Sequence, residues 1–166
     1  MTMSTIEKVL FLKTVPLFEQ LHSEELVGVA QIAHQVLIRA NQTFVEQGDR
    51  SEALFIIVAG EANAVIKHVG QVSRVGPKST IGDIAIVSDG PHSSSYVSTT
   101  DITALKIDYD DFWALMNEQP KISFGIIKVL VHHLNVVIEK LQMQQPSRRG
   151  LTNMPLDIWN ALEQLS

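Results

Sequence analysis

The sequence predicts a mainly β protein with flanking helices, in which the strands form an antiparallel sandwich, barrel or roll. Between residues 35 and 108, short runs rich in β-branched residues alternate with turn signals such as Gly48-Asp49, Gly60-Glu61 and Gly90-Pro91. Before and after this stretch, apolar residues recur at helical spacing. The run from Leu54 to Val58 has no polar alternation, so we expect it to be a strand buried on both faces.

The first 34 residues are expected to be helical from residue 5 onward. Ile6, Val9 and Leu10 give a short helix an apolar face, and Pro16 must end or turn it. A second helix is expected from about Glu24 to about His34. The sequence thus predicts helices in 5–34 and strands in 35–108.

Helical spacing returns over residues 109–145. Asp110 and Asp111 lead into a short helix, and Pro120 is placed in the first turn of a longer one. In the long helix, apolar residues form a heptad seam of Ile127, Leu130, Leu134, Val137 and Leu141. The seam spans about two heptads, which favours a stripe packed on the core over an autonomous coiled coil.

The chain of 166 residues is long enough for one domain with a short appendage. We predict a domain over 1–145, with helices in 5–34 and 109–145 around the β segment of 35–108. Pro146 and Gly150 break the polar stretch that follows. Residues 146–166 are therefore expected to be a hinge and a short C-terminal helix.

Composition excludes several classes of protein. An apolar content of 45% argues against disorder, and the absence of cysteine excludes disulfides and thiolate chemistry. Together these favour a cytoplasmic protein. Glu7, Lys8 and Lys13 break up the amino-terminal apolar residues, so we expect no signal peptide and no direct membrane insertion. A net charge of −5 argues against nucleic acid as a partner.

Residues 80–97 interrupt the strands with features that suit a ligand. Gly82 opens a short helical turn, whose first amides have no intrahelical acceptor and therefore suit an anion. Gly90-Pro91 breaks the chain again, and the hydroxyls of Ser93, Ser94 and Ser95 follow His92. A turn between strands would by itself explain Gly82. The rest of the sequence must therefore decide whether this segment is a turn or a ligand site.

The sequence offers little to support catalysis. The six histidines lack the spacing of a metal-binding helix, and we expect no metal site. A Gly-x-Ser-x-Gly elbow and a phosphate loop ending in Gly-Lys-Ser/Thr are both absent from the sequence. We therefore predict that the protein is not an enzyme.

Several motifs together resemble the cyclic nucleotide-binding domain family over about residues 5–140. They are Val15-Pro16-Leu17-Phe18, Ser23-Glu24-Glu25-Leu26, Gln47-Gly48-Asp49 with Ala53 to Glu61, and Asp110-Asp111-Phe112 with Gln119-Pro120. The resemblance implies an antiparallel jelly-roll-like β-roll (a double-stranded β-helix) with N-terminal helices and a long C-terminal helix. Such rolls occur in cAMP receptor protein and in the regulatory subunit of protein kinase A.

The resemblance also implies a phosphate-binding cassette with altered anchors. Asp83 stands where the family has a Glu that holds the ribose, and His92 stands where it has an Arg that pairs with the phosphate. The candidate ligand-binding residues are Gly82, Asp83, Ile84, Ala85, His92, Ser93, Ser94 and Ser95. The two replacements together should weaken binding by roughly two to three decades, at about 1.4 kcal/mol per decade.

Two regulatory functions remain open on this basis, beside catalysis as a third and less favoured class. The first is a non-catalytic sensor module whose degenerate cassette binds cyclic nucleotide weakly or not at all. The alternative is a functional cAMP- or cGMP-binding domain that controls an attached or docked effector protein, or a homodimer formed through the 121–141 helix. His92 is correspondingly either the cation that meets a phosphate or an exposed loop residue without a partner.

Overall fold

Two antiparallel sheets of four strands each form the centre of the fold, as predicted. The computed structural model describes residues 2–143, so the predicted hinge and short helix within 146–166 lie outside the described residues. One sheet has the strand order β1-β8-β3-β6 and the other has β2-β7-β4-β5. The strands are β1 (His34–Ile38), β2 (Thr43–Val45), β3 (Ala53–Ala59), β4 (Ala62–Ile66), β5 (Gly70–Val75), β6 (Thr80–Ile81), β7 (Ser95–Ser98) and β8 (Ile102–Asp108).

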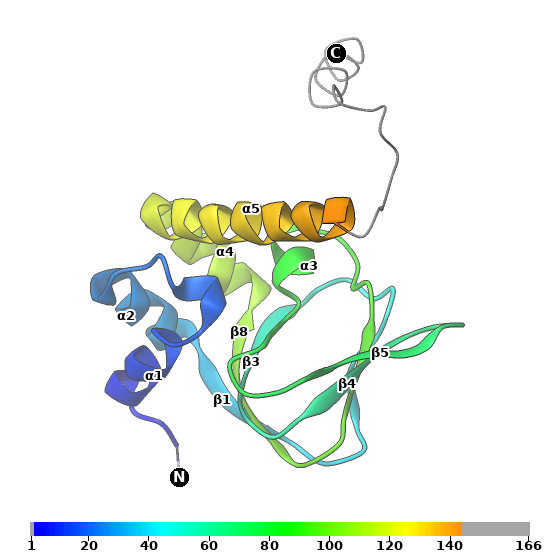
Figure 1. Ribbon diagram of the computed structural model, residues 1–166. Coiled ribbons are helices and arrows are strands. Elements are labelled where there is room, and N and C mark those ends of the chain that lie inside the picture. Colours follow the sequence, from blue (N-terminus) through cyan, green and yellow to red (C-terminus); the bar gives the residue numbers. More distant parts are fainter. Residues whose placement is uncertain (1, 144–166) are drawn as a thin grey trace, which may run out of the picture. The chain divides into compact units, whose positions relative to one another are not determined.

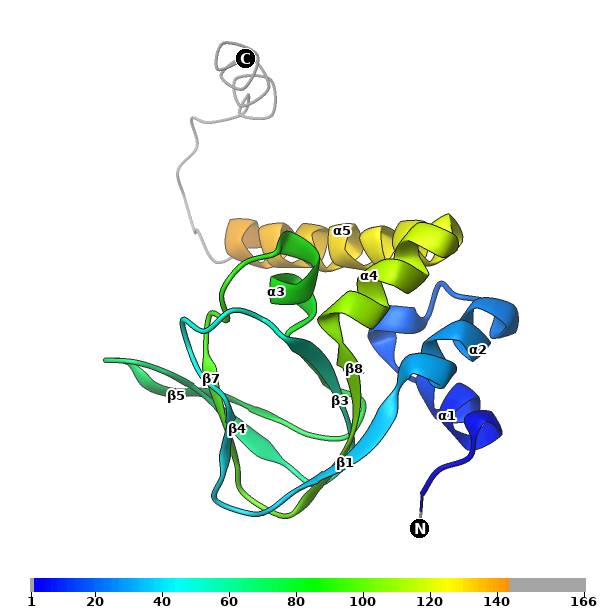
Figure 2. The same ribbon diagram turned by 180° about the vertical axis from the view of Figure 1, so that it is seen from behind.

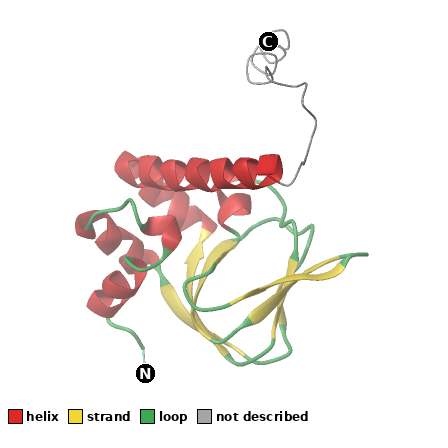
Figure 3. Cartoon of the chain, in the orientation of Figure 1, coloured by secondary structure: helices red, strands yellow, loops and turns green. Residues whose placement is uncertain are grey.

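Helices precede and follow the strands, and one short helix interrupts them (Figure 3). They are α1 (Thr5–Leu12), the 3-10 helix η1 (Pro16–Phe18), α2 (Ser23–Ile32), α3 (Asp83–Ser88), α4 (Tyr109–Glu118) and α5 (Pro120–Met143). The second helix ends at Ile32, two residues before the expected limit at His34. Ala33 already has an extended backbone with ψ 123°, and His34 pairs with Lys106 as the first residue of β1.

Strand β3 lies between two apolar cores. Leu54 and Ile56 are fully buried in a core shared with the helices, while Ile57 is buried in a second core between the two sheets. The predicted burial of this strand on both faces is thereby confirmed. In Figures 1 and 2, α1, α2 and α4 lie on the side of β1, β3 and β8 that faces away from β4 and β5.

Contacts between residues divide the chain into two compact units, and the boundary after Leu130 falls within α5. In the first part, Ile122, Ile126 and Val129 are buried in the helical core, and Leu130 packs against it. Ile127 of the predicted seam is 49% exposed. The core stripe is therefore formed by other positions of the helix, at spacings of four and three.

The remaining seam residues are also exposed in the second part of α5. Leu134, Val137 and Leu141 have exposed fractions of 58%, 51% and 59%. The prediction that the whole seam packs on the core is therefore wrong. Four of the five seam residues are exposed, Leu130 being the exception, while Ile122, Ile126 and Val129 are buried in the core.

The length and composition of α5 have a second consequence. Within the described part of the chain, Pro120–Glu139 is the one stretch apolar enough to cross a membrane, with a mean hydropathy of 1.5. Core helices of soluble proteins meet the same criterion. The absence of direct membrane insertion therefore stays a prediction.

Candidate functional site

The predicted site residues all lie in the segment 82–95, the cassette. Strand β6 leads into it by pairing Ile81 with Phe55 of β3. Gly82 then caps the start of helix α3, and its carbonyl accepts a hydrogen bond of 2.8 Å from the amide of Ile86. The indole Nε1 of Trp113 in α4 donates to the carbonyl of Ile86 at 3.1 Å. The short helix is thus attached to the sheet at its start and to α4 near its end.

Gly82 is required by the backbone at this corner. Its φ of 90° lies in the left-handed region, where a side chain is strained. A Cβ atom here would lie 2.9 Å from the carbonyl oxygen of Ala53 and 3.1 Å from Cε1 of His92. The His92 imidazole therefore packs directly against the start of α3.

The carboxylate of Asp83 is engaged by its own surroundings. Its Oδ2 accepts a hydrogen bond from Oγ1 of Thr80 at 3.1 Å, and its Oδ1 accepts one from the amide of Ile84 at 3.0 Å. Burial raises the pKa of Tyr96, and the negative charge of Asp83 raises it further. Asp83 thus serves the local fold with both of its oxygens.

His92 is buried, with 8% of its surface exposed. The interpretation of His92 as an exposed loop residue is therefore wrong. Its amide donates to the carbonyl of Asp49 and its carbonyl accepts from the amide of Gly48, both at 2.9 Å. These two bonds fix the residue against the turn between β2 and β3. Burial lowers the pKa of the imidazole, and the charge of Asp49 offsets part of that effect, so the neutral form is favoured.

The other predicted residues have different environments. Ser93 and Ile84 are exposed, whereas Ala85 and Ser94 are buried. The hydroxyl of Ser95 accepts from the amide of Gln47 at 2.9 Å and donates to the carboxylate of Glu46 at 3.2 Å. Ser95 therefore connects β7 to the turn that precedes β3.

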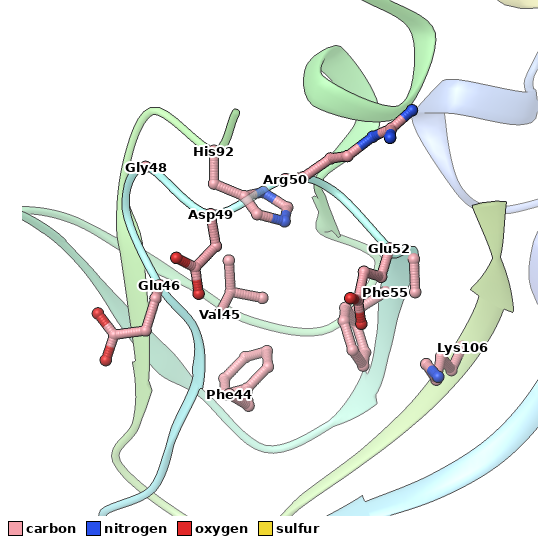
Figure 4. Close-up of a pocket in the computed structure, with 11 residues that line it drawn as sticks. Phe44, Val45, Glu46, Gly48, Asp49, Arg50, Glu52, Phe55, His92 and Lys106 are labelled. Atoms are coloured by element: carbon pink, nitrogen blue, oxygen red, sulfur yellow. The ribbon is translucent and has the colours of Figure 1, made fainter. Parts of the chain in front are cut away.

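Beside the cassette the structure forms a pocket of about 480 Å³ (Figure 4). Of the predicted site residues, only His92 lines it. The lining residues are Phe44, Val45, Glu46, Gly48, Asp49, Arg50, Glu52, Ala53, Phe55, His92 and Lys106. The sequence analysis did not identify this pocket, because Phe44, Phe55 and Lys106 belong to three strands that meet only in the folded chain.

Comparison with known families decides what kind of domain carries this site. The family model described as the cyclic nucleotide-binding domain matches residues 35–119, which are 85 of the 166 residues. The chain belongs to the cyclic nucleotide-binding domain family. The match covers the whole β segment together with α3 and α4.

Other proteins of this family show the same relationship. The chain is 30% identical over 107 residues to a cAMP-dependent protein kinase regulatory subunit of Aspergillus niger, covering 64% of this chain and 26% of that protein. It is 25% identical over 127 residues to the cyclic AMP receptor protein of Thermus thermophilus, covering 74% of this chain and 59% of that protein. The chain thus spans about a quarter of the first relative and about three fifths of the second.

A solved structure supports the fold assignment. The regulatory domain of Toxoplasma gondii PKA, crystallised with cAMP, superposes with a TM-score of 0.62 and 24% identity. The superposition covers 67% of this chain and 44% of that one. At this level of identity the likeness establishes the β-roll architecture of the cyclic nucleotide-binding domain.

One further cluster in this cyclic nucleotide-binding domain was not predicted. His34, Asp108 and Asp111 offer ligand atoms that lie within 4.8 Å of one another, at the junction of β1, β8 and α4. The ammonium of Lys106 lies 2.7 Å from Oδ1 of Asp108 and opposes a cation at this position. Histidine spacing along the sequence could not reveal a group assembled from three elements.

Burial of His92 should make the domain less stable in acid. Because its pKa is lowered in the folded state, the unfolded chain takes up the proton first as the pH falls through about 6.5. The contribution of neutral His92 to the free energy of unfolding is complete above about pH 6.5 and is lost as the pH falls below it. Urea unfolding at pH 7.5 and 5.5 should show a smaller acid loss of stability for His92→Gln than for the unaltered protein. Equal losses in both proteins would contradict this prediction.

Proposed function

We propose that this domain is a non-catalytic regulatory module that binds cyclic nucleotide weakly or not at all. The observation that carries the proposal is that the Asp83 carboxylate is hydrogen-bonded within the domain, while the His92 imidazole is buried and favoured in its neutral form. Asp83 is bonded to Thr80 and to the amide of Ile84, and buried His92 packs against Gly82. Neither side chain is poised for a ribose or a phosphate.

The energetics support this proposal. A hydrogen bond to a charged group is worth about 1.5–3 kcal/mol, and a neutral imidazole supplies no such charge. Protonating His92 beside a phosphate would also oppose the effect of burial on its pKa. Asp83 would have to exchange the Thr80 hydroxyl for a ribose hydroxyl, with little net gain.

A functional cAMP or cGMP sensor is the second candidate, and a specific observation favours it. The domain keeps the left-handed Gly82 and the short helix α3 of the cassette. A relative named as a cAMP-dependent protein kinase regulatory subunit matches 64% of the chain, and one named as a cyclic AMP receptor protein matches 74% of it. In this function, ligand binding would control an attached or docked effector protein.

Calorimetric titration of the full chain with cAMP and cGMP tests the proposal. We expect no saturable heat with either nucleotide at submillimolar concentrations. Linear 5′-AMP is the matched control, because it carries the same base and a phosphate without the cyclic ester. Saturable binding of a cyclic nucleotide below about 100 μM, with none of 5′-AMP, would overturn the proposal in favour of the sensor.

The exposed seam of α5 is the candidate contact for a homodimer through the 121–141 helix. Leu134 and Val137 are each more than half exposed, and lysine at both positions would place charges in an apolar interface. The double variant Leu134→Lys/Val137→Lys should shift a dimer to monomer in sedimentation experiments without unfolding the roll. Glu118→Lys, which adds the same two units of charge outside α5, should leave the dimer intact. A protein that is already monomeric at high concentration would contradict this prediction.

A further inference from the structure

The pocket beside the cassette has the size and lining of a small-molecule site. Its volume of about 480 Å³ lies within the usual range of about 300–1,000 Å³ for such sites. Phe44 of β2 and Phe55 of β3 meet edge to face, with ring centroids 5.6 Å apart and an interplanar angle of 76°. An apolar or aromatic ligand body could therefore pack against two rings.

The charges around the pocket are unbalanced. Three carboxylates line it, those of Glu46, Asp49 and Glu52. Figure 4 shows the Asp49 and Glu52 carboxylates and the His92 imidazole around the space above Phe44. Asp49 and Glu52 are exposed at the pocket, and among the described residues neither carboxylate has a side-chain ion pair.

The two permanent cations of the lining do not neutralise these acids, because each has a carboxylate of its own. The guanidinium of Arg50 is 2.7 Å from Oδ1 of Asp89 and lies over the ring of Tyr109, at 5.7 Å from its centroid. In Figure 4 this guanidinium points away from the other lining side chains. The ammonium of Lys106 is 2.7 Å from Asp108. The lining thus carries three carboxylates and two permanent cations, and each cation is paired with a carboxylate outside the lining.

His92 does not restore the balance. It is buried in the pocket wall, and burial lowers the pKa of its imidazole, so it adds no charge at neutral pH. The local potential therefore opposes an anion such as a phosphate and favours a positive group. The aromatic faces of Phe44 and Phe55 add to that preference, since their quadrupoles attract cations.

We propose that this pocket, formed by β2, the β2–β3 turn, β3 and β8, binds a small organic cation: a primary ammonium carried on an apolar or aromatic body. The ammonium lies between the carboxylates of Asp49 and Glu52, and the body packs on Phe44 and Phe55. This ligand class goes beyond the proposed function. Among the cassette residues, only His92 borders the pocket, so the ammonium site is separate from the position of a cyclic phosphate.

The test is calorimetric titration of the full chain with 2-phenylethylammonium at low ionic strength. We expect saturable binding of this cation and none of 3-phenylpropionate, which has a similar body and the opposite charge. Asp49→Asn and Glu52→Gln should each weaken the binding about tenfold, the effect of losing one charge-assisted contact. Glu19→Gln removes an exposed carboxylate that does not line the pocket and should leave the affinity unchanged.

Three results would overturn the proposal. The first is the absence of saturable heat up to about 10 mM 2-phenylethylammonium, roughly the limit of weak specific binding. The second is equal binding of 3-phenylpropionate. The third is equal affinity of both pocket variants and the unaltered protein. Because the two substitutions are isosteric, thermal melts that match the unaltered protein establish that a loss of binding is not unfolding. The outcome is independent of the cyclic nucleotide titrations, since the probe carries no phosphate and no ribose.

Discussion

Replacing His92 by Arg should tighten the binding of cAMP by about 10- to 100-fold. A guanidinium restores a permanent charge and a planar pair of donors, worth about 1.5–3 kcal/mol to a phosphate. Calorimetric titration of His92→Arg with cAMP measures its affinity, and a parallel titration of the unaltered protein sets the lower limit of the gain.

The matched control places the same charge one residue further along. Ser93 is exposed, so Ser93→Arg adds a guanidinium to the same loop without placing it in the buried position of His92. We expect little or no gain in affinity from this variant. If His92→Arg also shows no binding, another part of the site blocks the ligand. Tyr96 and the short side chain of Asp83 are the first candidates for this. The sensor function would then be contradicted.

The pH dependence of any residual binding follows from the same residue. A bound phosphate would raise the pKa of His92, so binding takes up a proton and the affinity rises as the pH falls. An imidazole with the ordinary pKa of about 6.5 would place this rise between about pH 8 and pH 6. Burial lowers the pKa of His92 in the unliganded protein, so the affinity should continue to rise as the pH falls below 6.5. His92→Arg should remove most of this dependence.

Much of the fold could be predicted because local signals and burial agree. Uninterrupted apolar residues from Leu54 to Val58 indicated the strand that both cores share, and the turn signals marked the ends of most strands. The face of α5 that packs on the core could not be predicted in this way. Its apolar residues cover more than one face, and only packing decides that Ile122 and Ile126 are buried while Ile127 is exposed.

The site was predictable only where it is continuous in sequence. Gly82 and the turn that follows it could be recognised from their order along the chain. The hydrogen bonds of His92 with Gly48 and Asp49 join loops about forty residues apart, and no local pattern indicates them. The same is true of the pocket, in which Phe44 and Phe55 lie on strands of different sheets.

Gly82→Ala should destabilise the domain by about 2–4 kcal/mol. A left-handed backbone costs a non-glycine residue roughly 1–2 kcal/mol, and here the new Cβ would also lie 2.9 Å from the carbonyl oxygen of Ala53. Because that oxygen belongs to the backbone of β3, the strand or the start of α3 must shift. Urea unfolding measures the loss.

Gly48→Ala is the matched control for this substitution. Gly48 has nearly the same φ, 92°, but a Cβ there would meet nothing within 4 Å. Only the conformational cost of roughly 1–2 kcal/mol should remain. Equal losses in the two variants would mean that the close approach at Gly82 contributes nothing.

The position of β3 between two cores has a consequence for how the domain comes apart. Leu54 and Ile56 serve the helical core while Phe55 and Ile57 serve the core between the sheets, and one backbone carries both sets. Neither core can melt alone without exposing the opposite face of the same strand to water. The helices and the roll are thus one cooperative unit, and the amides of β3 open to solvent only when that whole unit unfolds.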